Sequence, residues 1–316
     1  MKNLKDYFVD YDDSKRLHQS DYDEIRDKRD KILKELSSDE RVITSFSPIV
    51  LGSAKLLTGV KYDNGNYDID CGIRLNIKES ERKNYSAKDC KDSIFKVMSR
   101  YRDPEYKTKC ITAVYHSDGE PDFHIDFPVF AYDSDLETYY LANGKANETV
   151  TWEKSYPQEL IEYLTIKNDD YRRIVRLLKV WNYYAFKNEK KDAKAPSVAL
   201  TLETRDWFKN NIFSNDIDAL LSISKSIKNR INGDNIFLTN PFTSENIFYK
   251  MDADSECVSI FNEKLDFLIS QLQSAKNVSG TSIYDTCTKL RKVFPDFPAP
   301  EPEKAEKSVG TNTRYA

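Results

Sequence analysis

The stretch LGSAKLLTGVKYDNGNYDIDCGIRL, residues 51–75, contains the two features on which the interpretation of the whole chain rests. The Gly52-Ser53 pair follows a β-branched and aromatic run at 42–50, which predicts a strand or extended segment. An Asn-Gly-Asn turn signal then precedes an alternating run at 67–77, which predicts a second strand. We therefore expect a Gly-Ser turn between two extended segments.

The second predicted strand begins with Asp68-Ile69-Asp70. Residues two apart on a strand share a face, so both aspartates are expected on one face while Ile69 turns toward the core. Two ionised carboxylates ~7 Å apart repel each other unless a cation lies between them. Because oxygen ligands of this kind suit Mg²⁺ or Mn²⁺, the triplet predicts a divalent metal site.

A third aspartate lies in the run Phe-His-Ile-Asp-Phe-Pro at 123–128. Asp126 stands between Ile125 and Phe127, and burying a charge there without a partner would be costly. If this strand lies beside the first aspartate strand, Asp126 completes a three-carboxylate cluster. Such a cluster can hold two metal ions ~3.5–4 Å apart, one activating an attacking hydroxyl and the other stabilising the leaving pyrophosphate. His124 is interpreted as a polar neighbour, because Mg²⁺ prefers oxygen.

The Gly52-Ser53 turn is the third part of the predicted site. Glycine lets a backbone approach a phosphate closely, and the adjoining N–H groups and the Ser53 hydroxyl can bind phosphate oxygens. A Gly-Ser pair alone is usually only a turn, and an Asp-X-Asp triplet alone is weak in a chain with 52 acidic residues. Their order, followed by an apolar-flanked aspartate on a later strand, is much more specific.

Composition limits the classes of function. The chain has 316 residues, and 48 basic against 52 acidic residues give a formal net charge of −4, so indiscriminate nucleic-acid binding is not expected. No apolar run approaches the ~18 residues of a membrane span, and the N-terminus lacks a secretory pattern. The five cysteines show no zinc-type spacing, so we expect reduced thiols in a cytoplasmic protein.

The remainder of the chain divides into an α/β first half, a helical second half and a mobile, charged tail. In the first half, helices are predicted at 14–36 and 86–101, and strands at 109–115 and 123–132. The second half contains predicted helices at 171–186, 198–208, 217–231, 257–275 and 282–294.

These motifs resemble the polymerase-β-like nucleotidyltransferases, and more closely the bacterial cGAS/DncV-like nucleotidyltransferases, or CD-NTases. Further stretches share the resemblance in the family's order across residues 50–250: HIDFPVFAYD at 124–133, RRIVRLLKVWNYY at 172–184, PSVALT at 196–201 and TNPFTSENIFYKM at 239–251. The resemblance implies an α+β fold, with a mixed-sheet nucleotidyltransferase lobe at 1–160 that includes a long N-terminal helix. An all-helical lobe at 161–297 would close the cleft, and 298–316 would be a flexible tail.

The resemblance also assigns roles to individual residues. Asp68, Asp70 and Asp126 match the catalytic metal ligands, which hold two Mg²⁺ or Mn²⁺ ions. Gly52 and Ser53 match the phosphate-binding turn. Lys179 and Ser197 match the pair that contacts the donor triphosphate. From the residues alone, Lys179 belongs to a basic helix face with Arg172 and Arg176, which is usually just solvated, and Ser197 is an ordinary helix-start residue.

The implied function is synthesis of a cyclic di- or oligonucleotide messenger from nucleoside triphosphates, with release of pyrophosphate. The messenger would activate a separate effector in bacterial anti-phage (CBASS-type) signalling, and the C-terminal Ala316 resembles tails that a ubiquitin-conjugating-like partner joins to other molecules. No nucleic-acid activator is expected, because there is no zinc insertion or extended basic patch. Two alternatives stay open: transfer of nucleotides to RNA, protein or a small molecule by the same fold, and a nucleotide-binding regulator without catalysis.

Overall fold

The strand β2 (Asp68–Asn76) organises the sheet, because it pairs with three other strands. The antiparallel partner β1 (Phe46–Val50) lies along residues 71–75, while β5 (Glu120–Phe127) runs parallel to residues 68–70 and β6 (Val129–Asp133) runs parallel to residues 73–76. The remaining strands extend the sheet in the order β3-β4-β5-β2-β6-β7-β8, with β3 (Glu105–Tyr106), β4 (Ile111–Ser117), β7 (Thr138–Asn143) and β8 (Thr151–Ser155).

The computed structural model describes residues 2–62, 67–100, 104–117 and 120–301, without the side chains of Asp68 and of 116–117 and 120–123. The turn signal at 64–66 and the tail from 302 to Ala316 lie outside the described residues. The predicted conjugation site therefore stays a prediction.

The strand predicted at 123–132 is two strands in the structure. Pro128 separates β5 from β6, because proline has no N–H to donate to a ladder. Its carbonyl still accepts a hydrogen bond from the Ile73 N–H at 2.8 Å, so β2 passes from one partner to the other without losing the connection. This change of partner leaves Asp126 beside the start of β2.

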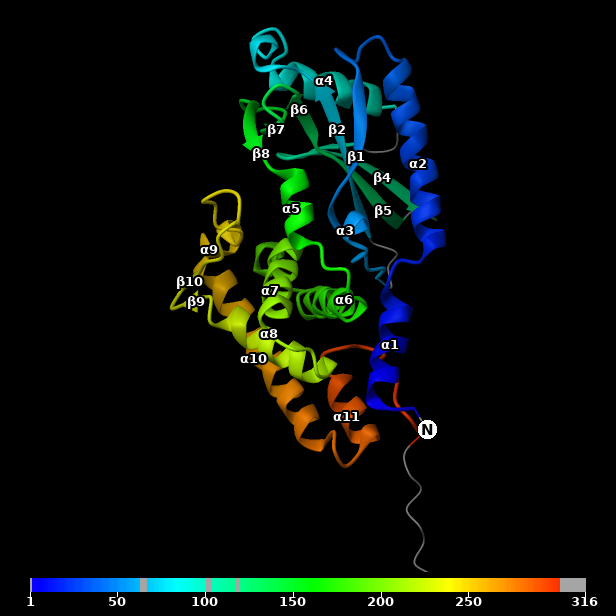
Figure 1. Cartoon of the computed structure of the whole chain (residues 1–316), viewed down its shortest axis with the longest axis vertical. Helices are drawn as coiled ribbons and strands as arrows, with labels where there is room; N and C mark the ends of the chain where they lie inside the picture. Colours follow the sequence, from blue (N-terminus) through cyan, green and yellow to red (C-terminus); the bar gives the residue numbers. More distant parts are fainter. Residues whose placement is uncertain (1, 63–66, 101–103, 118–119, 302–316) are drawn as a thin grey trace, which may run out of the picture.

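Each half of the chain has its own large cluster of buried hydrophobic side chains. One joins the sheet to α2 (Gln19–Ser38) and α4 (Ala87–Met98). The other lies among the helices of the second half. These are α5 (Pro157–Leu164), α6 (Asp169–Ala185), α7 (Ser197–Asn210), α8 (Asp216–Lys228), α9 (Tyr249–Asp252), α10 (Ser255–Val278) and α11 (Ile283–Leu290). Figure 1 shows the sheet with α4 and α2 at the top and these helices below it.

Short elements complete the architecture: the five-residue α3 (Gly52–Leu56), the single-turn helices at Glu79–Glu81 and Lys191–Ala193, and the hairpin of β9 (Ile231–Asn232) and β10 (Asn235–Ile236). The α+β fold with a helical second half is confirmed. No helix in the described part of the chain is long and apolar enough to cross a membrane.

The N-terminal region differs from the single helix predicted at 14–36. The structure has α1 (Leu4–Lys15) and α2, separated where Leu17 N–H donates to Gly59 O at 3.2 Å. A new helix then begins because the Asp21 carboxylate accepts from the His18 N–H at 2.8 Å. The sequence alone could not show that the chain leaves the helix to pair with the segment around Gly59.

The helix α1 packs with the helical half rather than with the sheet. Its residues Phe8 and Tyr11 belong to the helical cluster and contact the rings of Phe294 and Phe297 from the end of the described chain. The Tyr11 hydroxyl also donates to Pro295 O at 2.9 Å. Figure 1 shows this C-terminal segment, in red, beside α1. The boundary predicted at residue 160 stays a prediction, but α1 shares the core of the second lobe.

Candidate active site

Two of the three predicted metal ligands are direct neighbours across the sheet. Asp70 on β2 and Asp126 on β5 are partners in the parallel register, as are the buried Ile69 and Ile125 before them. Because side chains alternate along a strand, the two aspartates share the face opposite the isoleucines. Asp68 lies on the same strand in register with His124, and its side chain is outside the described part.

Asp126 is held on one side of its carboxylate. The Thr112 hydroxyl, from the neighbouring strand β4, donates to Oδ1 of Asp126. The ammonium group of Lys107 lies 3.5 Å from the same oxygen. The Cys110 thiol lies beside the same carboxylate, and burial together with this neighbouring charge raises the pKa of the thiol. The Asp126 side chain is 21% exposed, so part of the carboxylate remains accessible to a ligand.

The Gly-Ser turn lies directly against Asp70. Leu51 N–H donates to the Asp70 carbonyl at 3.1 Å, and α3 begins at Gly52 with φ at +57°. A Cβ built at Gly52 would overlap the carboxylate of Asp70. Only glycine fits here without displacing that side chain, for reasons of space and of backbone conformation.

Lys179 reaches the site from the opposite lobe. It lies on α6 and is 7% exposed, and its ammonium group donates to the carbonyl oxygen of Thr58 at 3.0 Å and to the hydroxyl oxygen at 3.3 Å. Arg176, one turn earlier, is also buried and pairs with Asp12. The interpretation of these two residues as a merely solvated basic face is therefore wrong: they turn inward, toward α1 and the segment after α3.

Ser197 opens α7 and completes the group. The segment before it is fixed by Asn182 of α6, whose amide donates to Ala195 O at 2.8 Å and accepts from Ala195 N–H at 3.1 Å. As a result Ser197 faces the same cavity as the Gly-Ser turn. That cavity has a volume of about 260 Å³ and is lined by Gly52, Ser53, Asp70, Lys179 and Ser197, with apolar walls from α5 and α7.

The donors present fit a divalent cation. Carboxylate oxygens are the ligands that Mg²⁺ and Mn²⁺ prefer, and the strand register places Asp70 beside Asp126, while the missing Cβ at Gly52 leaves room for the Asp70 carboxylate. Within the part of the chain that the structure describes, no group of three potential metal-binding side chains occurs. The three-carboxylate cluster also needs Asp68, so it stays a prediction.

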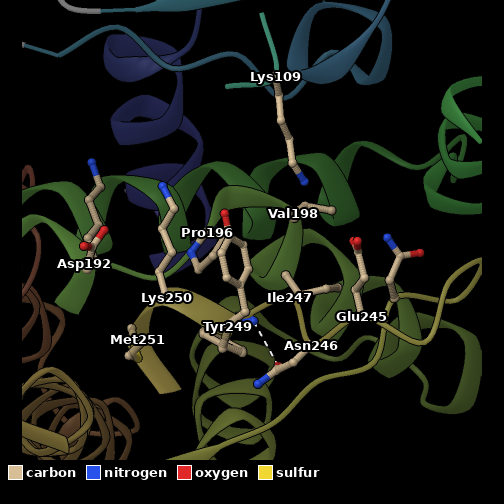
Figure 2. Close-up of a pocket in the computed structure, with 13 residues that line it drawn as sticks. Lys109, Asp192, Pro196, Val198, Glu245, Asn246, Ile247, Tyr249, Lys250 and Met251 are labelled. Atoms are coloured by element: carbon tan, nitrogen blue, oxygen red, sulfur yellow. Dashed lines mark hydrogen bonds between the residues drawn. The ribbon is translucent and has the colours of Figure 1, made fainter. Parts of the chain in front are cut away.

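A second cavity of about 320 Å³ adjoins the first and shares Val198 with it. Its walls come from both lobes. In Figure 2, Lys109 extends from above toward Val198, while Tyr249 and Lys250 belong to the first turn of α9. Tyr249 N–H donates to Asn246 O at 3.1 Å, which fixes this segment beside the cavity. The two cavities therefore share a wall at Val198.

Sequence reasoning missed the residues that support the site. Thr112 and Lys107 contact Asp126, Thr58 receives Lys179, and Asn182 fixes the start of α7. Thr112 alone carried a usable signal, because it stands on a predicted strand that a turn-rich connection joins to the strand of Asp126. The others depend on contacts between segments far apart in the chain.

The fold, and a pocket lined by a Gly-Ser turn, an aspartate and a lysine, are what the sequence comparison with nucleotidyltransferases predicts. Residues 49–130 match the family model described as "Cyclic GMP-AMP synthase DncV-like, nucleotidyltransferase domain". The chain therefore carries a DncV-like nucleotidyltransferase domain, which contains β1, α3, β2 and the strand of Asp126.

Solved structures share the fold over nearly the whole chain. The Bradyrhizobium diazoefficiens CD-NTase CdnG in complex with GTP is 12% identical, with a TM-score of 0.72 over 93% of this chain and 95% of that one. Vibrio cholerae DncV cyclic AMP-GMP synthase with the linear intermediate pppA(3′,5′)pG is 15% identical, with a TM-score of 0.70 over 94% and 97%. Escherichia coli MS115-1 CdnC with ATP is 16% identical, with a TM-score of 0.65 over 93% and 98%. No curated protein sequence matched the chain.

Proposed function

We propose that this protein joins nucleoside triphosphates into a cyclic di- or oligonucleotide and releases pyrophosphate. The observation that carries the proposal is the first cavity, in which Gly52, Ser53, Asp70, Lys179 and Ser197 from separate segments converge. Each of these residue types suits a triphosphate or its metal, and the fold is that of CD-NTases. The relatives bound to GTP, ATP or a linear dinucleotide support the class of substrate.

The residues would divide the work as follows. Asp68, Asp70 and Asp126 would hold two divalent cations, which when bound neutralise phosphate charge and favour ionisation of the attacking hydroxyl. Lys179 and the hydroxyls of Ser53 and Ser197 would bind the phosphate oxygens of the donor. Asp126 would help to activate the acceptor ribose hydroxyl, whose proton would pass to water. The ribose oxygen would form a bond to the α-phosphorus as the bond from the α-phosphorus to the oxygen that bridges to the β-phosphorus breaks, and pyrophosphate would leave.

The second cavity supports a reaction between two nucleotides. It meets the first at Val198, and Lys109 and Lys250 add positive charge at its edge. A second nucleotide bound there would lie next to the donor. Cyclisation requires that the linear product binds again with its ends exchanged, and two adjoining cavities can accommodate both orientations.

The test is incubation of the purified protein with four labelled nucleoside triphosphates and Mg²⁺ or Mn²⁺, without any acceptor. Phosphatase treatment and mass spectrometry then identify resistant products. We expect a resistant cyclic product from the unmodified chain and none from Asp70→Asn. Asp135→Asn is the matched control, because Asp135 is 65% exposed and its side chain contacts Lys78 and Ser134, which lie outside the proposed site, so this variant should keep full activity.

Other outcomes identify the alternatives. Extension of added RNA without any cyclic product would favour a tailing enzyme. Binding of nucleotide without turnover, with an unchanged biological output in Asp70→Asn, would favour a non-catalytic regulator. A cyclic product that persists in Asp70→Asn would contradict the assigned site.

The cellular setting is proposed from the sequence resemblance: a cytoplasmic enzyme of bacterial anti-phage signalling, whose product activates a separate effector. Conjugation of Ala316 by a ubiquitin-conjugating-like partner is part of the same proposal. Intact mass after co-expression with such a partner tests it, and an unmodified C-terminus would count against it.

A further inference from the structure

Lys91 is a buried charge to which the proposed reaction assigns no role. It lies on α4, is fully buried, and belongs to the same lobe as Asp126. Burial lowers the pKa of Lys91 to about 8, so at pH 7 the side chain still carries an ammonium group with three N–H donors. A buried ammonium group needs acceptors for these donors, since leaving them without partners would be costly.

The acceptors are backbone carbonyls of two segments. Nζ of Lys91 donates to the carbonyl oxygens of Lys107 at 2.7 Å, Thr108 at 2.9 Å and Gly144 at 3.0 Å, with Ala142 O farther away at 3.4 Å. Gly144 N–H in turn donates to Thr108 O at 2.9 Å. The ammonium group thus joins the connection between β3 and β4 to the end of β7.

Two other residues of α4 hold the same connection. The ring of Tyr106 lies over the Lys91 ammonium group, 4.5 Å from its centroid, and its hydroxyl donates to Asp92 at 3.0 Å. Phe95 packs edge-on against that ring. Lys107 follows directly after this fixed tyrosine, and its own backbone carbonyl is bound to Lys91. The chain is therefore held at two successive residues: at Tyr106 through its side chain and at Lys107 through its backbone carbonyl.

The side chain of Lys107 emerges from this fixed backbone and meets Asp126. Its ammonium group lies 3.5 Å from Oδ1, the oxygen that Thr112 also contacts. The side chain of Lys107 is 43% exposed, and its ammonium group also lies 3.5 Å from the carboxylate of Glu105. The position of its backbone therefore decides whether the charge reaches Asp126 as well. A shift of the connection would withdraw this charge and leave Oδ1 of the carboxylate with the Thr112 hydroxyl but without Lys107.

We propose that Lys91 is a positioning residue for the nucleotidyl transfer site: by binding the carbonyls of 107–108, it places Lys107 so that the Asp126 carboxylate is held through Oδ1 with Oδ2 directed to its ligand. This role rests on the proposed function of Asp126. Lys91 itself touches neither carboxylate nor substrate, so its effect passes through Lys107.

The test compares kinetics at pH 7 for Lys91→Met, Lys107→Met and the double variant. We expect each single variant to lower kcat about tenfold. KM for the nucleoside triphosphate should stay within about twofold, because neither lysine lines the first cavity, where we propose that the donor triphosphate binds. The double variant should be no worse than the poorer single variant, since both changes remove the same contact. Lys96→Met, an exposed lysine on the same helix, is the matched control and should match the unmodified protein.

A second measurement needs neither metal nor nucleotide. Hydrogen exchange of the Lys107 and Gly144 amides, which donate to Cys110 O and Thr108 O, should be faster in Lys91→Met and unchanged in Lys96→Met. If Lys91→Met does not fold, Lys91→Gln, which keeps two N–H donors, is measured in the same way.

One result would contradict the proposed function, and a different result would contradict only the role of Lys91. An unmodified protein without any nucleotidyl transfer contradicts the proposed function. An active protein in which Lys91→Met folds and keeps its kcat, or in which the two lysine effects multiply, contradicts the role of Lys91 alone. Unchanged exchange at Lys107 and Gly144 does so as well.

Discussion

Gly52 lies so close to Asp70 that the two residues constrain each other. A Cβ at residue 52 would overlap the Asp70 carboxylate, and the backbone at Gly52 has φ of +57°, a conformation that other residues rarely adopt. The hydrogen bond from Leu51 N–H to Asp70 O ties the turn to the strand on the backbone side as well. The turn and the proposed metal ligand therefore form a single unit.

Gly52→Ala should abolish most of the nucleotidyl transfer activity, with a loss of about 100-fold or more in kcat, because the new methyl group displaces the carboxylate of Asp70. Gly233→Ala is a matched control. Gly233 has φ of +60°, but a methyl group there would meet nothing within 4 Å, so this variant carries the backbone strain without the overlap. Rates of both variants, with their melting temperatures, test this. Equal activity of the two would show that the contact with Asp70 does not matter.

The sequence predicts those parts of the site whose residues lie close together along the chain, and misses contacts between residues that are far apart in the sequence. The Gly-Ser turn, the aspartate triplet and Asp126 follow from local patterns, and the sheet register places Asp70 beside Asp126 as the strand interpretation requires. Thr58 could not be assigned in this way, because its partner Lys179 is 121 residues away. A hydrogen bond of that kind depends on how the two lobes pack, which no local pattern encodes.

The fold shows the same division. Alternation predicts β2 and the strand of Asp126, but Pro128 divides the latter, and the short strands β7 and β8 carry too little alternating pattern to be recognised. In the N-terminal region, helical periodicity continues across 16–18, whereas the chain breaks there to pair Arg16 with Val60. Tertiary pairing overrode local propensity at that point.

The ion pair between Asp12 and Arg176 predicts a stability effect outside the site. Both oxygens of Asp12 accept from Arg176, each at 2.6 Å, and both side chains are 8% exposed. Asp12→Ala should lower the free energy of unfolding by about 3–5 kcal/mol, because it leaves a buried guanidinium group without its partner. Urea unfolding measures the change.

The neighbouring residue supplies the control for that experiment. Asp13 pairs with Arg16, but the two side chains are 55% and 46% exposed. Asp13→Ala should change the free energy of unfolding by at most about 1 kcal/mol. If both variants lost the same free energy of unfolding, burial of the Asp12–Arg176 pair would not be the cause of its contribution to stability.

Lys179→Met should weaken nucleoside triphosphate binding about tenfold or more, which is equivalent to ~1.4 kcal/mol. The substitution removes a positive charge from the first cavity but keeps an apolar side chain of similar length at position 179. Lys187→Met, at an exposed position just after α6, is the control for charge alone. Equilibrium titration with labelled ATP in the presence of Mg²⁺ measures both. Unchanged affinity in Lys179→Met would remove Lys179 from the proposed triphosphate contacts and leave it as a structural partner of Thr58.

The five cysteines are free thiols, as the sequence predicts, and the structure shows that all five are buried, which makes their reactivity a test of the fold. Burial raises the pKa of Cys71, Cys90 and Cys110 to about 12 and that of Cys287 to about 11, and it also raises the pKa of Cys257. A thiol with a pKa of 12 is a thiolate in only about one molecule in ten thousand at pH 8, and the thiolate is the form that reacts.

The native protein should therefore react slowly with a thiol reagent such as DTNB at pH 8, whereas unfolding in guanidinium should release all five thiols at once. Peptide mapping after brief alkylation identifies any exception. Cys110 is the informative one, because its sulfur lies 3.7 Å from the Thr112 hydroxyl that contacts Asp126. Rapid labelling of Cys110 in the folded protein would mean that β4 opens beside Asp126, which would contradict the fixed carboxylate on which the proposed mechanism depends.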